Sequence, residues 1–322
     1  MERNLYWEDG MTNAYPNSAI KLNKNDGAKP WIKDFHSIYT ELVGCNIRTI
    51  KGKKYVTRVI EYDGGGEPLI LIHGTGGSAE SWFRNIRNLG TKHGFHVYSI
   101  DAMYHGFSSK EPVTGDRIGM QIEHLLDFMD AEGIAKANVE GESMGSFIAL
   151  RLGLNHPERC LKLVLNTGAA VNFKREFKPS LQPPEALRVL TQELLDNPSE
   201  ETVRHRMEWL MAAPERVDDE LVNLRLQFFK MPELQQAQRQ TGASNTQAPV
   251  LRVEEEALKG MKVPCLVFWS EFNPGGGPDI GEYFASLIPG AKFFNLLDAA
   301  HWPQYEHAEE HDQVVADFIQ SK

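Results

Sequence analysis

Hydrophobic residues along this chain follow two spacings that alternate with one another. Short runs are apolar at nearly every position, as in PLILIHG (68–74) and HVYSID (96–101), which is typical of strands buried on both faces of a sheet. Longer stretches have apolar residues three and four positions apart, as in 114–133, which is typical of amphipathic helices. This alternation predicts an α/β protein with a doubly wound, mostly parallel sheet. The same patterns predict further strands at 137–143, 160–168, 263–270 and 291–298 and further helices at 79–93, 144–156, 279–288 and the C-terminus.

Two segments depart from this alternation. Residues 45–66 contain two alternating stretches around Gly52 and end in a glycine-rich turn, which predicts a hairpin ahead of the first buried strand. From about 173 to 258 only helical patterns occur, without a strand candidate. A helical insertion of this size predicts a lid over the carboxyl edge of the sheet, where such folds bind ligands. We therefore divide the chain into an N-terminal extension that is at most partly ordered (1–45), a core (46–172 and 259–322) and an all-helical lid (173–258).

Composition narrows the class of protein. The 322 residues are 41% hydrophobic and 24% charged, as in ordinary soluble globular proteins. The net charge of -10 argues against nucleic acid or an anionic membrane as the main partner. No apolar run approaches the roughly 18 residues of a spanning helix, and the start of the chain has no hydrophobic signal-peptide core. Three widely spaced cysteines indicate neither a disulfide framework nor a zinc cluster, so we expect a cytoplasmic protein.

The stretch NVEGESMGSF (138–147) contains a candidate nucleophile. Its G-x-S-x-G pattern is common by chance, but here Ser143 falls where a predicted strand passes into a predicted helix. A sharp turn at that point lifts the hydroxyl clear of the sheet edge, and the flanking glycines avoid clashes. The backbone N–H of Met144, at the helix start, can then point at a developing oxyanion. The alternative is an ordinary tight turn without chemistry.

Two further stretches offer partners for this serine. LIHGTGGSAESW (71–82) places a His-Gly-rich loop directly after a buried strand, where a second oxyanion donor would lie. His301 follows the last strand, and an imidazole is the base that a serine needs near neutral pH. Serine before histidine is also the chain order of α/β-hydrolases. Of the other histidines, His73 is expected to hold the oxyanion loop in shape and His105 to hold a neighbouring turn.

The chain from about Cys45 to its end resembles the α/β-hydrolases, and most of all the meta-cleavage-product hydrolases. Those enzymes cleave carbon–carbon bonds in 2-hydroxy-6-oxo-dienoates from aromatic ring degradation. The matching stretches are LIHGTGGSAESW, DAMYHGFSS, GESMGS, HWPQYEHAEE and DDELVNLR. The resemblance implies an α/β-hydrolase fold with an oxyanion hole formed by Thr75 and Met144. It also implies a set of residues that bind the substrate, which are Gly74, Glu142, Arg225 and Trp302. Among these, Arg225 would bind the carboxylate of the substrate.

Two positions depart from that family's pattern. The family usually has Asn before its nucleophile, whereas this chain has Glu142, whose negative charge would repel an anionic substrate unless neutralised or turned away. The family's acid follows the penultimate strand in a W-G-x-x-D pattern, and Asn273 stands in place of that Asp. We take Asn273 as the third catalytic member because its amide oxygen can orient an imidazole. The alternatives are Glu271, on the same loop, and Asp279, which a helix start also explains; Asn166, where some α/β-hydrolases place an acid, is an amide as well.

No cofactor or metal is expected. The glycines of the His-Gly loop lack the third spaced glycine of a dinucleotide fingerprint. His307 to His311 fit the H-x-x-E-H pattern of some metalloproteases, but little chain remains for a distal ligand, and we interpret the segment as a solvated helix face. The partners expected are a small-molecule substrate and, at most, a second copy of the chain in a homodimer, with neither nucleic acid nor membrane.

These patterns predict a cofactor-independent serine hydrolase of small, largely apolar carbonyl compounds. Carbon–carbon bond hydrolysis of a meta-cleavage-type 2-hydroxy-6-oxo-dienoate is the activity that the resemblance implies. A carboxylesterase or lactonase with a neutral substrate is the alternative, since Glu142 would tolerate such a substrate better. A non-catalytic ligand-binding protein on the same fold is a further alternative, because fold does not dictate function.

Overall fold

The core of the protein is one mixed sheet of eight strands in the order β1-β2-β4-β3-β5-β6-β9-β10, built from residues 37–177, 184–241 and 252–321 that the computed structural model describes. Strands β1 and β2 form an antiparallel hairpin, as predicted, and β2 also pairs antiparallel with β4. All other neighbours are parallel. The strands are β1 (Asn46–Lys51), β2 (Val56–Asp63), β3 (Pro68–Ile72), β4 (His96–Ile100), β5 (Ala137–Glu142), β6 (Cys160–Asn166), β9 (Cys265–Ser270) and β10 (Lys292–Leu296).

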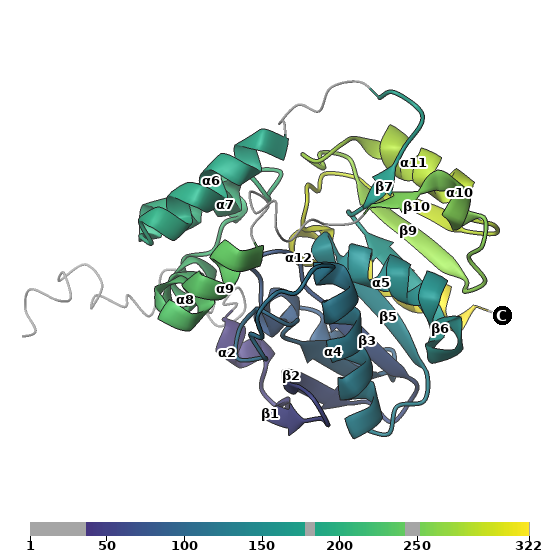
Figure 1. Ribbon diagram of the computed structural model, residues 1–322, viewed down its shortest axis with the longest axis horizontal. Coiled ribbons are helices and arrows are strands. Elements are labelled where there is room, and N and C mark those ends of the chain that lie inside the picture. Colours follow the sequence, from purple (N-terminus) through teal and green to yellow (C-terminus); the bar gives the residue numbers. More distant parts are fainter. Residues whose placement is uncertain (1–36, 178–183, 242–251, 322) are drawn as a thin grey trace, which may run out of the picture. The chain divides into compact units, whose positions relative to one another are not determined.

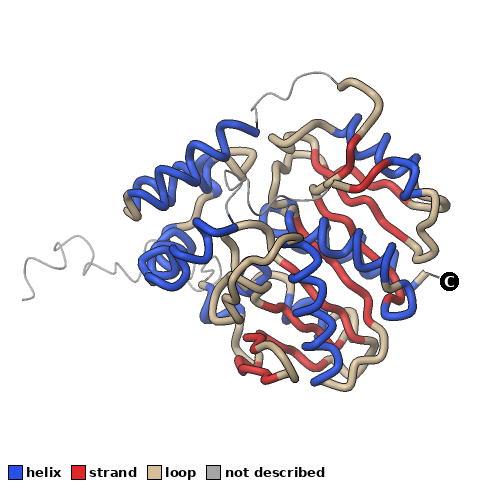
Figure 2. The backbone as a smooth tube through the Cα atoms, viewed as in Figure 1, coloured by secondary structure: helices blue, strands red, loops and turns tan. Residues whose placement is uncertain are grey.

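Helices cover both faces of this sheet, which confirms the doubly wound arrangement (Figures 1 and 2). On one face α4 (Arg117–Ala131), α5 (Met144–Asn155) and α11 (Pro278–Leu287) contribute to a large apolar core. On the other face α3 (Ile86–Thr91) and α13 (Ala308–Gln320) contribute to a second core. Because both faces are covered, β9 is buried at every position, which explains its nearly continuous apolar run, whereas β5 is also buried throughout but includes Asn138, Glu140 and Glu142. The remaining short helices are η2 (Ala79–Trp82), η3 (Pro157–Arg159), α10 (Glu255–Leu258) and α12 (Pro303–Glu306).

Between the short strands β7 (Val171–Asn172) and β8 (Val253–Glu254), the described residues form four α-helices. They are α6 (Pro184–Asp196), α7 (Glu200–Glu208), α8 (Asp219–Lys230) and α9 (Pro232–Thr241), with the short helix η4 (Pro214–Arg216) between α7 and α8. Figure 1 shows these four helices grouped together, apart from those that cover the sheet. Side chains from this group pack with Trp302 and Tyr305 in a third apolar cluster.

One expectation for the helical segment needs correction, and part of the predicted extension is ordered. The stretch predicted to lack strands contains β8 (Val253–Glu254), which pairs with β7 (Val171–Asn172) in a separate two-stranded sheet. Two residues are too few to give a period in the sequence, so pattern reasoning could not find this pairing. Within the predicted extension, Ile38–Glu41 forms the short helix α2, and the backbone N–H of Ile38 donates to Glu220 over 2.9 Å. The rest of that extension, residues 1–36, lies outside the described residues.

The interpretation of the H-x-x-E-H segment as a solvated helix face is wrong for His311. This residue is fully buried, and its Nε2 lies 2.7 Å from Oε1 of Glu140 on β5. His311 precedes Val315 by four positions and therefore shares the helix face that packs against the sheet. The rest of the segment fits the interpretation, since His307 is half-buried and Glu309 and Glu310 are exposed. In the part of the chain that the structure describes, no cluster of three or more His, Cys, Asp and Glu side chains could hold a metal ion.

No helix within the described ranges is long and apolar enough to cross a membrane.

Candidate active site

Ser143 lies at the turn between β5 and α5 in a left-handed backbone conformation, with φ 54° and ψ −110°. The turn is possible because Gly141 and Gly145 have no side chains: a Cβ on Gly141 would collide with the carbonyl of Gly145, and one on Gly145 with the carbonyl of Ile72. The Ser143 N–H donates to the carbonyl of Asn166 over 2.9 Å. This turn holds a half-buried serine hydroxyl at the carboxyl edge of the sheet, where α/β-hydrolases place their nucleophile.

His301 is held from several sides in the loop after β10. Its Nδ1 donates to Oδ1 of Asn273 over 2.7 Å, which leaves Nε2 unprotonated and able to act as a base. Its backbone N–H donates to the carbonyl of Leu210, so the helical segment helps to position the loop. The side chain is 7% exposed. Burial, assisted by the positive charge of Arg206, lowers the pKa of His301 to about 3, so the resting imidazole is neutral.

The other candidates for the third catalytic member lie elsewhere. Glu271 is exposed, and its carboxylate accepts the backbone N–H of Asp298 over 2.9 Å. Asp279 is in the first turn of α11. Asn166 donates to Glu140 over 3.0 Å from the end of β6. Asn273, in the short loop after β9, is therefore the candidate that contacts Nδ1 of His301.

Glu142, the residue before Ser143, points into the same site. The side chain is 1% exposed, and its Oε2 accepts the N–H of Gly74 over 2.7 Å. A Cβ on Gly74 would collide with this carboxyl group, so glycine is needed there. Oε1 lies 3.3 Å from Nε2 of His301 and has no hydrogen-bond partner among the described residues. Burial raises the pKa of Glu142 to about 8, against the N–H of Gly74 and the charges of Arg225 and Arg206.

Two buried arginines from the helical segment face Glu142. The guanidinium of Arg225, on α8, lies 4.5 Å over the ring centre of Trp302. Neither of its Nη atoms has a hydrogen-bond partner in the described ranges. Arg206, on α7, donates from Nη2 to the carbonyl of Thr75 over 2.8 Å, while its Nη1 is likewise unpartnered in those ranges. Burial lowers the pKa of Arg225 to about 9 and that of Arg206 to about 10. Two cations thus share the site with one carboxyl group.

Sequence reasoning missed Arg206. Val203, Met207 and Leu210 are buried beside it at helical spacing, so the arginine interrupts the apolar stripe of α7. A lone cation within such a stripe is the signal that could have found it, since an arginine is rarely buried without a partner or a function.

The loop that follows β3 is fixed by its own histidine. His73 contacts the carbonyl of Gly74 through Nδ1 over 2.7 Å, and its Nε2 accepts the N–H of Ala102 over 3.0 Å. Burial lowers the pKa of His73 to about 4, consistent with a neutral ring that both donates and accepts. This loop contains Thr75, whose carbonyl accepts from Arg206. The contacts agree with the expectation that His73 holds the loop in shape.

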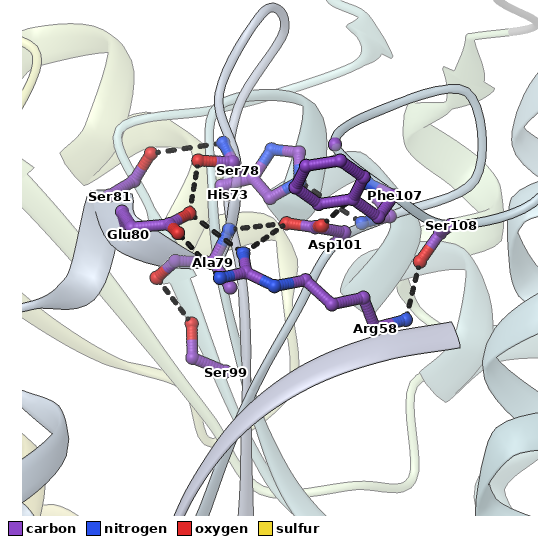
Figure 3. Close-up of polar contacts among 12 residues, drawn as sticks. Arg58, His73, Ser78, Ala79, Glu80, Ser81, Ser99, Asp101, Phe107 and Ser108 are labelled. Carbon is purple, nitrogen blue, oxygen red and sulfur yellow. Dashed lines mark hydrogen bonds and ion pairs between the residues drawn. The ribbon is translucent and has the colours of Figure 1, made fainter. Parts of the chain in front are cut away.

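A buried ion-pair network contacts the residues at the end of the same loop (Figure 3). Arg58 donates to both carboxylate oxygens of Glu80 over 2.9 and 2.6 Å and lies 3.5 Å from the carboxylate of Asp101. Asp101 accepts the backbone N–H of Ala79 over 2.7 Å, and Ser78 donates to Glu80 over 2.7 Å. The network joins β2, η2 and the turn after β4, so the end of the loop cannot shift independently of the sheet.

The chain belongs to the alpha/beta hydrolase fold family, whose model matches residues 67–308. More particularly, it is 30% identical over 260 residues to a 2-hydroxy-6-oxononadienedioate/2-hydroxy-6-oxononatrienedioate hydrolase of Pseudomonas sp., covering 79% of this chain and 88% of that one. A protein of the same name from Paraburkholderia phymatum is 29% identical over 259 residues, with the same coverage. Among solved structures, the meta-cleavage product hydrolase of Pseudomonas fluorescens has the same fold, with a TM-score of 0.73 at 23% identity over 86% of this chain and 98% of that one.

Proposed function

We propose that the protein is a serine hydrolase that cleaves a carbon–carbon bond in a 2-hydroxy-6-oxo-dienoate. The observation that supports this activity best is Arg225, a buried guanidinium stacked on Trp302, with both Nη atoms unpartnered among the described residues. A buried cation without a partner is costly, and a substrate carboxylate would supply the missing charge and hydrogen bonds. Relatives named as hydrolases of dienedioates support the same substrate class.

The proposed reaction begins with a proton transfer by His301. His301 helps convert the dienol of the substrate to its keto form, so that the departing fragment can accept the electrons of the broken bond. Ser143 then attacks, or activates water to attack, the 6-oxo carbon, and its proton passes to Nε2 of His301. The N–H groups of Thr75 and Met144 stabilise the oxyanion. When the carbon–carbon bond breaks, its electron pair moves through the conjugated chain to the 2-oxo oxygen of the departing fragment, which takes the proton from His301. If Ser143 is the attacking group, water then hydrolyses the resulting ester. Asn273 keeps the imidazole in the tautomer that this cycle requires.

The charges of the site suit an anionic substrate despite Glu142. Arg206 and Arg225 together supply two positive charges and Glu142 at most one negative charge. The sum is at least +1, which can balance one buried carboxylate. Of the two cations, Arg206 is already tied to Thr75, so Arg225 is the one proposed to bind the substrate carboxylate.

The helical segment is proposed to act as a lid. It contributes Arg206, Arg225 and the carbonyl of Leu210 to the site, so its position and the site's geometry are linked. The division into extension, core and lid, the homodimer and the cytoplasmic location stay predictions.

A substrate panel tests the proposal. The purified protein is mixed with coloured 2-hydroxy-6-oxo-dienoates, with short p-nitrophenyl esters and with lactones, and kcat/KM is measured for each. We expect the dienoates to bleach with a kcat/KM at least about 10²-fold above that of the neutral substrates. Turnover of esters or lactones without bleaching would establish the carboxylesterase or lactonase alternative. No turnover, together with no labelling of Ser143 by a fluorophosphonate, would indicate a binding protein.

A further inference from the structure

The imidazole of His301 faces a charge problem during turnover. When Nε2 takes up the serine proton the ring becomes a cation, yet the side chain is buried and Arg206 already adds positive charge. On the Nδ1 side the partner is the amide of Asn273, which offers a dipole but no negative charge. Among the described residues, the carboxyl group that contacts the ring is Glu142, on the Nε2 side at 3.3 Å.

We propose that Glu142 is a further catalytic residue, whose carboxylate stabilises the imidazolium form of His301 from the Nε2 side. The proposal rests on Ser143 and His301 acting as nucleophile and base, as in the proposed function. Three contacts support it: Oε2 is fixed by the N–H of Gly74, Oε1 is left without a hydrogen bond in the described ranges, and that free oxygen is the one turned toward Nε2. An oxygen with no other partner is available to a charge that appears beside it.

The step balances without a bond to Glu142. The Oγ–H bond of Ser143 breaks, its proton joins the lone pair of Nε2, and the Oγ lone pair forms a bond to the substrate carbonyl carbon. The π electrons of that carbonyl move to its oxygen. When the tetrahedral species collapses, the carbonyl re-forms, the electron pair of the broken bond leaves with the departing group, and that group takes the Nε2–H proton, so the imidazole is neutral again. In molecules in which Glu142 is ionised, it stays so through this cycle and contributes only its charge.

The charged groups that face Glu142 determine when it is ionised. They are Arg225 and Arg206 from the helical segment and His301 from the loop after β10, with the N–H of Gly74 and the indole of Trp302 as neutral donors that also favour ionisation. Burial opposes ionisation, and the two guanidiniums favour it. The resting carboxyl therefore loses its proton at mildly alkaline pH, and the rate should rise with that ionisation.

A set of four proteins tests the proposal: wild type, Glu142→Gln, Asn273→Asp and the double variant. Glutamine keeps an oxygen for the N–H of Gly74, so the fold should persist. The primary readout is the second-order rate of Ser143 labelling by a fluorophosphonate, which reports the serine–histidine pair whatever the natural substrate is. We expect Glu142→Gln to lower this rate between about 10²- and 10⁴-fold, in line with the loss of a charge beside a catalytic imidazole. Glu310→Gln, an exposed change on α13, is the matched control.

The Asn273→Asp substitution tests whether Glu142 acts through its charge or only by holding His301 in position. A carboxylate at position 273 would supply the missing charge from the Nδ1 side, so the double variant should recover most of the rate lost in Glu142→Gln. The alkaline rise in the wild-type pH profile should also vanish in Glu142→Gln. A Glu142→Gln rate within about threefold of wild type would overturn the proposal, and so would a loss that Asn273→Asp leaves unchanged. Absence of dienoate bleaching alongside these labelling results would contradict the proposed function alone.

Discussion

Oε1 of Glu142 lies 3.3 Å from Nε2 of His301, the ring nitrogen proposed to receive the proton of Ser143. Both side chains are buried, so each senses the protonation state of the other with little screening by water. The two groups come from strands that are not adjacent in the sheet, since Glu142 ends β5 and His301 follows β10. The helical segment adds Arg206 and Arg225 to the same site. This relationship makes both the stability and the reactivity of the protein depend on pH.

Glu142→Gln should change how stability varies with pH. The pKa of Glu142 is raised from 4.5 to about 8 in the folded protein, so the folded state holds this proton more tightly than the unfolded chain does. The wild type therefore loses stability from this group as pH rises from 4.5 to 8, and the glutamine variant does not. We expect the variant to gain on the order of 2–5 kcal/mol relative to wild type between pH 5 and pH 8.5. Urea unfolding of both proteins at both pH values measures this difference. If the difference in unfolding free energy between variant and wild type is the same at pH 5 and pH 8.5, the pKa of Glu142 is not raised by burial.

Arg225→Gln should weaken binding of anionic substrates selectively. Removing the guanidinium leaves a substrate carboxylate without its charged partner, which should raise KM for a dienoate by about 10²-fold, while a neutral ester is affected less than threefold. Steady-state kinetics with both substrates measure the contrast. Arg204→Gln is the control, because Arg204 lies on the adjacent helix but pairs with Glu200 and Asp219 at the surface. Equal effects of Arg225→Gln on the two substrates would contradict the proposal that Arg225 binds the substrate carboxylate.

The buried pair of Glu140 and His311 should show strong energetic coupling. Both side chains are inaccessible to solvent, and the charges of Glu140 and Asp312 raise the pKa of His311 to about 9 although burial alone would lower it. Replacing one partner, as in Glu140→Leu or His311→Phe, leaves an uncompensated group and should cost about 3–5 kcal/mol. The double variant should cost far less than the sum. Denaturant unfolding of wild type, the two single variants and the double variant measures the coupling energy. If the losses of the single variants add up in the double variant, the two side chains are not coupled.

The sequence alone predicted the parts of the fold that depend on local pattern. Buried strands such as β3 and β9 have nearly continuous apolar runs, and the turn at Ser143 follows from the passage of a predicted strand into a predicted helix together with its flanking glycines. Asn273 could be placed beside His301 because each follows a strand end by a short loop.

What the sequence could not provide was the partnership of polar residues far apart in the chain. Glu142 was expected to repel an anionic substrate unless neutralised or turned away, but the sequence did not indicate the groups that it meets, which are His301 across the site and Arg206. His311 was expected at the surface because polar residues usually are, but Glu140, 171 positions earlier, compensates its burial. Such pairings depend on which strands become neighbours, and periodicity specifies only which face of one element is apolar.

The role assigned to Ser143 is tested most directly by the rate at which the protein bleaches a 2-hydroxy-6-oxo-dienoate before and after Ser143→Ala. The hydroxyl is half-buried at the edge of the sheet, so the alanine variant should fold and melt like wild type. We expect wild type to bleach the substrate with simple saturation kinetics and Ser143→Ala to lose on the order of 10³-fold or more in kcat. A folded Ser143→Ala variant that keeps more than a few per cent of the bleaching rate would contradict the assignment of Ser143 as the nucleophile.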